Sequence, residues 1–194
     1  MTTSETGRAA ERSRPTETVG PLELATGISL RVARSGTPSP GEPTLVLAHG
    51  WSQDLRTWDR VVGDLRRAGV TAPILRYDHR GHGGSQSPGR TGATIGRAAD
   101  DLAALMTDHV EGPILLAGHS MGGMTLMALA ERHPDLVRER VRGAAFVATA
   151  SDDMAEMRLG IPGRRGAFVA RGERWIMPWL ASVGDRAPDR KSVV

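Results

Sequence analysis

A short glycine-rich stretch between a strand-like run and a helix-like run constrains this chain more than any other feature. Residues 118–123 read Gly-His-Ser-Met-Gly-Gly. Residues 113–117 before them form an apolar run of strand length, and residues 124–132 are rich in Leu, Ala and Met, which favour helices. A strand that turns into a helix over one serine needs small residues on both sides, because the turn is tight. The sequence therefore predicts a strand, a sharp turn that exposes the hydroxyl of Ser120, and a helix.

Strand-like and helix-like segments alternate through the middle of the chain. Residues 22–24 and 28–33 alternate in polarity around Thr26 and Gly27, which is typical of a β-hairpin. The remaining expected strands are 44–48, 72–77, 113–117 and 141–150, and the expected helices are 54–68, 94–109 and 124–132. We expect the last of these helices to be ended by His133 and Pro134. Strands that alternate with helices favour an α/β fold with a mostly parallel sheet.

The composition excludes several classes of protein. A chain of 194 residues with 39% hydrophobic and 24% charged residues fits one globular domain. The net charge is only +3 and no basic run is interleaved with aromatic residues, so we expect no nucleic-acid partner. The absence of cysteine excludes disulfides and thiolate metal sites. No apolar run is long enough for a membrane span or a signal peptide, and the expected location is the cytoplasm.

Four segments are expected along the chain. Residues 1–18 are polar and are predicted to be a disordered tail, and residues 19–150 form the α/β core. Residues 151–188 mix Met, Phe and Trp with arginines and glycines, which is typical of short irregular helices with an apolar face and not of another strand–helix unit. Residues 189–194 contain Lys191, the single lysine of a chain that otherwise uses arginine, so we interpret them as a non-native tail.

Three segments, in this order along the chain, resemble motifs of the α/β-hydrolase family. They are His49–Trp51 after the first buried strand, Tyr77–Ser85 after the next strand, and Gly118–Gly123. The likeness covers residues 20–150 well and residues 151–188 loosely, and it is most similar to esterases, lipases and cofactor-free haloperoxidases. It implies an α/β-hydrolase fold, a mostly parallel sheet with flanking helices, incomplete at the C-terminus and ending at the start of a helical cap.

The resemblance also implies roles for individual residues. In the nucleophile elbow at residues 118–123, Ser120 would attack a carbonyl carbon and form an acyl-enzyme. The backbone N–H groups of Met121 and Trp51 would form the oxyanion hole, which needs preorganised donors. The loop Asp78–Ser85 is expected to be architectural rather than a metal or phosphate site. We therefore expect a small-molecule acyl or ester substrate, no cofactor and no metal.

A serine nucleophile needs a base, and the base needs an orienting carboxylate. After Ser120 the only histidine is His133, about 18 Å along the predicted helix at 1.5 Å per residue, which is too far to act as the base. Asp152, with Asp153 beside it, follows the last predicted strand and is the candidate acid. The sequence therefore predicts a serine hydrolase for ester-type acyl substrates, here a fragment that lacks the catalytic histidine and is inactive or nearly so.

Two other functions remain open at this point. A cofactor-free haloperoxidase or perhydrolase of the same fold would use the same serine, and a hydrolase-like binding protein would not react at all. An epoxide or haloalkane hydrolase with an aspartate nucleophile is disfavoured, because position 120 is serine.

Overall fold

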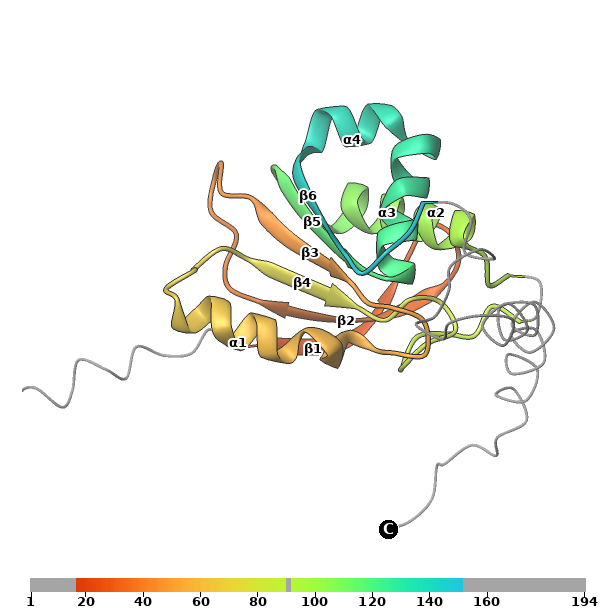
Figure 1. Ribbon diagram of the computed structural model, residues 1–194, viewed down its shortest axis with the longest axis horizontal. Coiled ribbons are helices and arrows are strands. Elements are labelled where there is room, and N and C mark those ends of the chain that lie inside the picture. The colour runs from red at the N-terminus through yellow and green to blue at the C-terminus, as the bar shows by residue number, and fades with distance from the viewer. Residues whose placement is uncertain (1–16, 90–91, 152–194) are drawn as a thin grey trace, which may run out of the picture. The chain divides into compact units, whose positions relative to one another are not determined.

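Six strands form one sheet in the computed structural model, which describes residues 17–89 and 92–151 (Figure 1). The sheet has the strand order β1-β2-β4-β3-β5-β6. β1 pairs antiparallel with β2 and β2 pairs antiparallel with β4, whereas β4, β3, β5 and β6 are parallel. The bounds are β1 Glu17–Glu23, β2 Ser29–Ser35, β3 Thr44–Ala48, β4 Ile74–Tyr77, β5 Ile114–His119 and β6 Val141–Val147. The predicted α/β fold with a mostly parallel sheet is confirmed.

Helices cover both faces of the sheet. They are η1 Leu55–Trp58, α1 Asp59–Arg67, α2 Ile95–His109, α3 Met121–Arg132 and α4 Pro134–Arg140. On one face, η1 and α1 pack through Trp58 and partly buried leucine and valine side chains against Leu47, Ile74 and Ala117. On the other face, α2 and α3 pack against the opposite side chains of the same strands, such as Val46. β3 is buried on both faces, as its unbroken apolar run predicts.

The structure departs from the sequence predictions in two places. β1 begins at Glu17, where the N-terminal tail was expected to be disordered, because Glu17 and Thr18 pair with the end of β2. Pro134 begins helix α4 instead of ending the region, since a proline at the first helical position loses no hydrogen bond and Asp135 suits the positive end of the helix dipole. The cap segment after Ser151 and the tail at 189–194 lie outside the described residues and stay predictions.

The order of the strands reverses direction between β3 and β5. β3 and β5 are neighbours, yet the chain leaves β3 through α1 on one face and leaves β5 through α3 on the other. The two connections run in opposite directions, to β4 and to β6. Open α/β sheets bind their ligands at such a switch point, beyond the carboxyl ends of the strands. The ends of β3 and β5 are therefore where a site is expected from topology alone.

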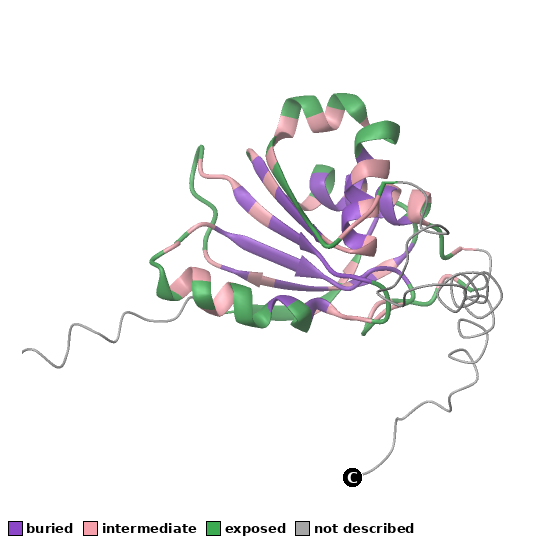
Figure 2. Cartoon of the chain, in the orientation of Figure 1, coloured by how far each residue is buried: buried purple, intermediate pink, exposed green. Residues whose placement is uncertain are grey.

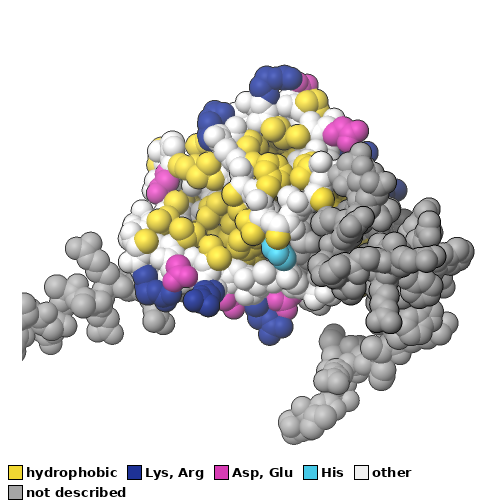
Figure 3. All heavy atoms as spheres, in the orientation of Figure 1, with side chains coloured by type: hydrophobic (Ala, Val, Ile, Leu, Met, Phe, Trp, Pro, Cys, Tyr) yellow, Lys and Arg dark blue, Asp and Glu magenta, His cyan; other side chains and the backbone are white. Residues whose placement is uncertain are grey.

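Among the described residues, β6 is an edge strand without the protecting residues found in the strand at the other edge of the sheet. β1 carries Pro21 and a glutamate at each end, and these residues disfavour the addition of another strand. In β6, Phe146 is 50% and Val147 43% exposed, and no charged residue follows Arg142. Figure 2 shows β6 exposed along most of its length beside buried inner strands, and Figure 3 shows hydrophobic side chains gathered between α1 and α4.

We expect the 194-residue chain to self-associate through β6. The variant Phe146→Lys should lower the light scattering of concentrated solutions, because a charge on an edge strand disfavours pairing with a further strand. The control is Val61→Lys, which makes the same change at an apolar residue of α1 that is 40% exposed. Equal scattering by the two variants would show that β6 is not the associating element.

Candidate active site

Ser120 has a backbone conformation that few residues other than glycine adopt. It stands between β5 and α3 with φ 50° and ψ −114°. Three hydrogen bonds hold it there: its N–H donates to Val147 O at 2.9 Å, and its carbonyl oxygen accepts from Thr149 Oγ1 at 2.7 Å and from Met124 N at 3.2 Å. Such strain costs about 1–3 kcal/mol and persists only where the surroundings impose it. The predicted sharp turn over Ser120 is thus present, and the end of β6 braces it.

The glycines around Ser120 lie so close to neighbouring atoms that no side chain would fit in their place. A Cβ at Gly118 would lie 2.6 Å from the backbone of Gly122 and Gly123. A Cβ at Gly122 would lie 2.2 Å from Ala48 O, and one at Gly123 would lie 2.6 Å from the side chain of Thr149. The start of α3 therefore rests directly on the end of β3, with no space for a side chain between them.

We expect Gly122→Ala to destabilise the fold. The new methyl group would overlap the carbonyl oxygen of Ala48, and overpacking of this kind costs about 1–3 kcal/mol of the free energy of unfolding. The control is Gly63→Ala inside α1, where the nearest atom is the end of Arg67 at 3.6 Å and alanine favours the helix by about 0.5–1 kcal/mol. Urea unfolding of both variants measures the difference, and a neutral effect of Gly122→Ala would contradict the close contact.

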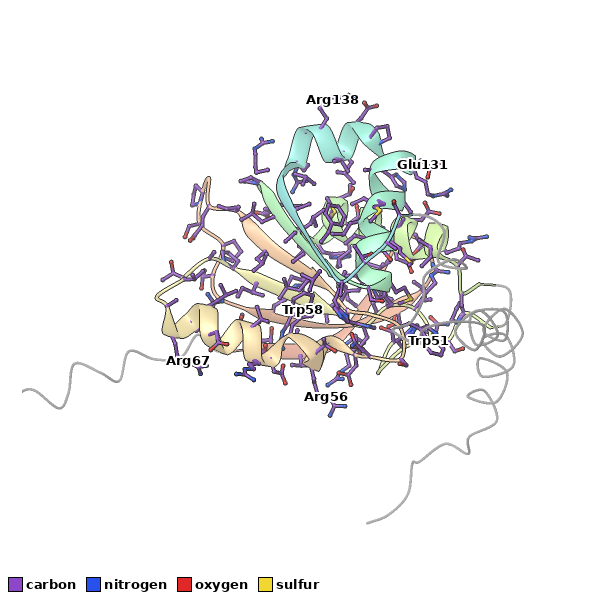
Figure 4. The ribbon with its side chains drawn as sticks, in the orientation of Figure 1. Trp51, Arg56, Trp58, Arg67, Glu131 and Arg138 are labelled. Carbon is purple, nitrogen blue, oxygen red and sulfur yellow. The ribbon has the colours of Figure 1, made fainter. Side chains whose placement is uncertain are left out.

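The loop after β3 lies next to this turn. β3 is followed by His49, Gly50 and Trp51, and the side chain of Trp51 is 41% exposed beyond the end of the strand, whereas Trp58 packs against the sheet (Figure 4). Gln53 N donates to Gly50 O at 3.3 Å and Ser52 has φ 56°, so the loop is a tight turn.

The backbone N–H groups of Trp51 and Met121 follow the ends of the paired strands β3 and β5. Met121 is the first residue of α3, and the N–H groups of a first helical turn have no partner within the helix. Trp51 follows β3, whose carbonyl oxygens at Ala48 and His49 are close to Gly122. Within residues 17–89 and 92–151, neither the Trp51 nor the Met121 N–H is used in a loop or turn hydrogen bond. The two predicted donors thus stand at the ends of the neighbouring strands β3 and β5, outside these hydrogen bonds.

His49 and His79 form a buried pair behind the loop. His79 N donates to His49 Nε2 at 3.0 Å, so the proton of the His49 ring is on Nδ1, which donates to Gly50 O at 2.7 Å. His79 Nε2 donates in turn to His49 O at 3.1 Å. Burial lowers the pKa of His49 and holds the pKa of His79 well below its ordinary value. These rings are neutral parts of the loop architecture.

The hydrogen-bond contacts of the remaining histidines are also with residues other than Ser120. His119 Nδ1 contacts Gln53 Oε1 at 3.1 Å. His133 directly follows α3, at the end away from Ser120, and its Nε2 contacts Asp100 of α2. His82 Nδ1 lies 3.0 Å from Arg80 O, and His109 ends α2. All six histidines of the sequence lie in the described part of the chain, and none of these contacts involves the Ser120 hydroxyl.

The loop Asp78–Ser85 is organised by the buried carboxylate of Asp78. Its Oδ1 accepts from Leu55 N at 2.6 Å and its Oδ2 accepts from Gly84 N at 2.8 Å. Gly83 has φ 53°, and a Cβ there would lie 2.1 Å from Asp78 Oδ2. Arg80 forms a buried ion pair with Asp101 of α2. These contacts join the loop to η1 and α2.

The neutral histidine pair predicts that the fold loses stability in acid. Below the unfolded-state pKa of about 6.5 the unfolded chain binds protons that the buried rings of His49 and His79 do not, so the free energy of unfolding falls by up to about 1.4 kcal/mol per pH unit for each ring. Above that pH the contribution is fully present. His79→Gln, whose amide can still donate to His49 O, should show a smaller loss of urea midpoint between pH 7 and pH 5.

The control for this measurement is His109→Gln at the end of α2. It removes one histidine without touching the buried pair. If His79→Gln and the unchanged protein lost the same amount of stability between the two pH values, His79 would not be the group that resists protonation.

The structure adds two residues that the sequence analysis missed. Thr149 holds the carbonyl oxygen of Ser120, and Gln53 lies between the loop after β3 and His119. Neither stands in a motif with Ser120, and only the sheet brings them close, so no local spacing could have indicated them. The candidate acid Asp152 and its neighbour Asp153 lie outside the described residues, and that assignment stays a prediction.

Among residues 17–89 and 92–151, no three His, Asp or Glu side chains are grouped so that they could hold a metal ion. No helix there has the length and apolar character needed to cross a bilayer.

A strained serine between a parallel strand and a helix, at the switch point of the sheet, defines the class. The chain belongs to the α/β-hydrolase fold family, whose model matches residues 43–177. The predicted α/β-hydrolase resemblance is confirmed.

Individual relatives are hydrolases of several kinds. Lipase LipV from Mycobacterium tuberculosis is 32% identical over 156 residues, which are 78% of this chain and 56% of that protein. A pimeloyl-[acyl-carrier protein] methyl ester esterase from Neisseria meningitidis is 30% identical over 151 residues, 76% of this chain and 55% of that one. The structure of epoxide hydrolase A from Mycobacterium thermoresistibile is 29% identical with a TM-score of 0.57, covering 68% of this chain and 39% of that one. The chain thus spans about half the length of the curated relatives it matches.

Proposed function

We propose that this chain is part of a serine hydrolase that cleaves ester-type acyl substrates through an acyl-enzyme on Ser120. The observation that carries the proposal is the conformation of Ser120, strained and braced between β5 and α3 beside two available N–H donors. Packing can require this backbone conformation but does not require a serine there, since a glycine would adopt the same backbone without cost. In this proposal the serine is present for its hydroxyl, above the start of α3.

The proposed reaction begins with attack of Ser120 Oγ on the carbonyl carbon of the substrate. The carbonyl oxygen gains a negative charge as the bond forms, and the N–H groups of Trp51 and Met121 stabilise it. Met121 adds the positive end of the α3 dipole. Loss of the alcohol leaves an acyl-enzyme, which water then hydrolyses.

Serine at position 120 and the names of two relatives support an ester substrate. The lipase and the methyl ester esterase share about a third of their residues with this chain over the matched region. The epoxide hydrolases among the relatives give less support, because an aspartate nucleophile would have to stand where Ser120 is. The acyl and alcohol groups are left open.

We further propose that the general base is not one of the six histidines of this sequence. Both ring nitrogens of His49 are used within the loop, and His79 is held in the same pair. His119 is directed to Gln53 and His133 to Asp100. A positioned base contributes about 10²–10⁴ to the rate, so the chain itself should react slowly.

We expect a fluorophosphonate to label the 194-residue chain slowly and only at Ser120. Added imidazole should raise the labelling rate by at least about tenfold, because it supplies part of the 10²–10⁴ that a positioned base provides. Mass spectrometry of the labelled peptide measures both the site and the rate. Ser120→Ala is the control and should not react.

The possible results separate the alternatives. Fast labelling that imidazole does not change would mean that a base lies within the chain. No labelling at any imidazole concentration would favour a hydrolase-like binding protein over an enzyme.

A further inference from the structure

One side-chain oxygen lies between the two segments that carry the proposed oxyanion donors. Gln53 Oε1 accepts from Gly50 N at 2.8 Å, and Gly50 directly precedes Trp51. The same oxygen lies 3.1 Å from Nδ1 of His119, which directly precedes Ser120. Gln53 thus contacts the loop after β3 and the end of β5 at once.

These contacts determine where the protons are. The Gly50 N–H can only donate, so the atom of the Gln53 amide that faces it is the oxygen. An amide oxygen can only accept, so His119 Nδ1 must carry a proton and donate it to Gln53. The His119 ring is thereby turned toward the loop and cannot accept the proton of Ser120 through that nitrogen.

The close approach depends on a glycine. A Cβ at Gly50 would lie 2.8 Å from both Gln53 Oε1 and His119 Nδ1. The bond from Gln53 N to Gly50 O closes the same turn in the reverse direction. Gly50 and Gln53 therefore exchange two hydrogen bonds, and His119 is attached to this closed turn.

We propose that Gln53 is a positioning residue, whose amide oxygen holds the Trp51 and Met121 N–H groups at a fixed separation. The inference rests on the proposed function, since this separation matters only if the two groups bind an oxyanion. Gln53 touches neither the serine nor the substrate position and acts through Gly50 and His119. Among the described residues, its oxygen makes the one side-chain hydrogen bond that joins the loop to β5.

Three variants test the role of Gln53. Gln53→Met has a similar length and no acceptor, and Gln53→Glu keeps an oxygen in the same place. Gln86→Met is the matched control, because the Gln86 amide oxygen also accepts a backbone N–H, from Ser29 at 3.0 Å, and has no contact with the loop or with His119.

Two readouts are measured on the 194-residue chain. Nitrogen NMR of His119 and hydrogen exchange of the Gly50 amide report the link itself. The imidazole-supported labelling rate of Ser120 reports its effect on reactivity. We expect Gln53→Met to remove the acceptor of the His119 Nδ1 proton and to speed hydrogen exchange of the Gly50 amide. It should also slow the labelling of Ser120 by at least about tenfold, since misplacing a catalytic group by 1 Å costs about 10²-fold. Gln53→Glu should restore most of the rate, and Gln86→Met should change none of the readouts.

The outcomes keep this inference separate from the proposed function. Equal labelling rates for Gln53→Met and Gln86→Met would overturn the positioning role while leaving Ser120 as the nucleophile. If the unchanged chain did not label at all, the proposed function and the positioning role that rests on it would both be overturned. If Gln53→Met changed neither the hydrogen exchange of the Gly50 amide nor the tautomer of His119, the proposed link between the loop after β3 and β5 would be overturned.

Discussion

The contact between the start of α3 and the end of β3 is the constraint on which the rest of the site depends. A Cβ at Gly122 would lie 2.2 Å from Ala48 O, so helix and strand meet backbone to backbone. This contact requires the chain to leave β5 and enter α3 within one residue, which gives Ser120 its positive φ. It also brings the first N–H of α3 beside the loop at Trp51. The positions of the proposed nucleophile and of both proposed donors thus depend on one missing side chain.

The strain at Ser120 is held by one of the two exposed edge strands of the sheet. Val147 accepts the Ser120 N–H, and Thr149, just beyond β6, donates to the Ser120 carbonyl oxygen. Val147 is 43% exposed, whereas the side chains of β4 are buried. A brace on an exposed edge can move more easily than one inside the core, because fewer contacts oppose its displacement. Any segment that packed against β6 would therefore also stabilise the conformation of Ser120.

Features formed by consecutive residues could be predicted from the sequence. Contacts that depend on which strands are neighbours in the sheet could not. The flanks of residues 118–123 indicated the turn at Ser120, because strand, turn and helix are consecutive. The proposed oxyanion role of Trp51 came only from family resemblance, since nothing local shows that β3 and β5 are neighbours. Gln53 and His119 are 66 residues apart and belong to no shared motif. Helix α4 was missed because Pro134 was interpreted as an end, although a proline serves equally well as a helix start.

The histidines show how a chain can hold the proposed oxyanion donors in place and still lack a group that accepts the proton of the serine. Burial favours the neutral ring of His49, and its two nitrogens then act as one donor and one acceptor within the loop. A ring used in this way fixes the backbone at Gly50 but has no lone pair left for a serine proton. An oxyanion donor contributes about 10²–10³ to catalysis and a positioned base about 10²–10⁴, so the two parts are of similar size and separable. In the proposed function this chain provides the first through Trp51 and Met121, and the buried rings of His49 and His79 hold the loop that carries Trp51.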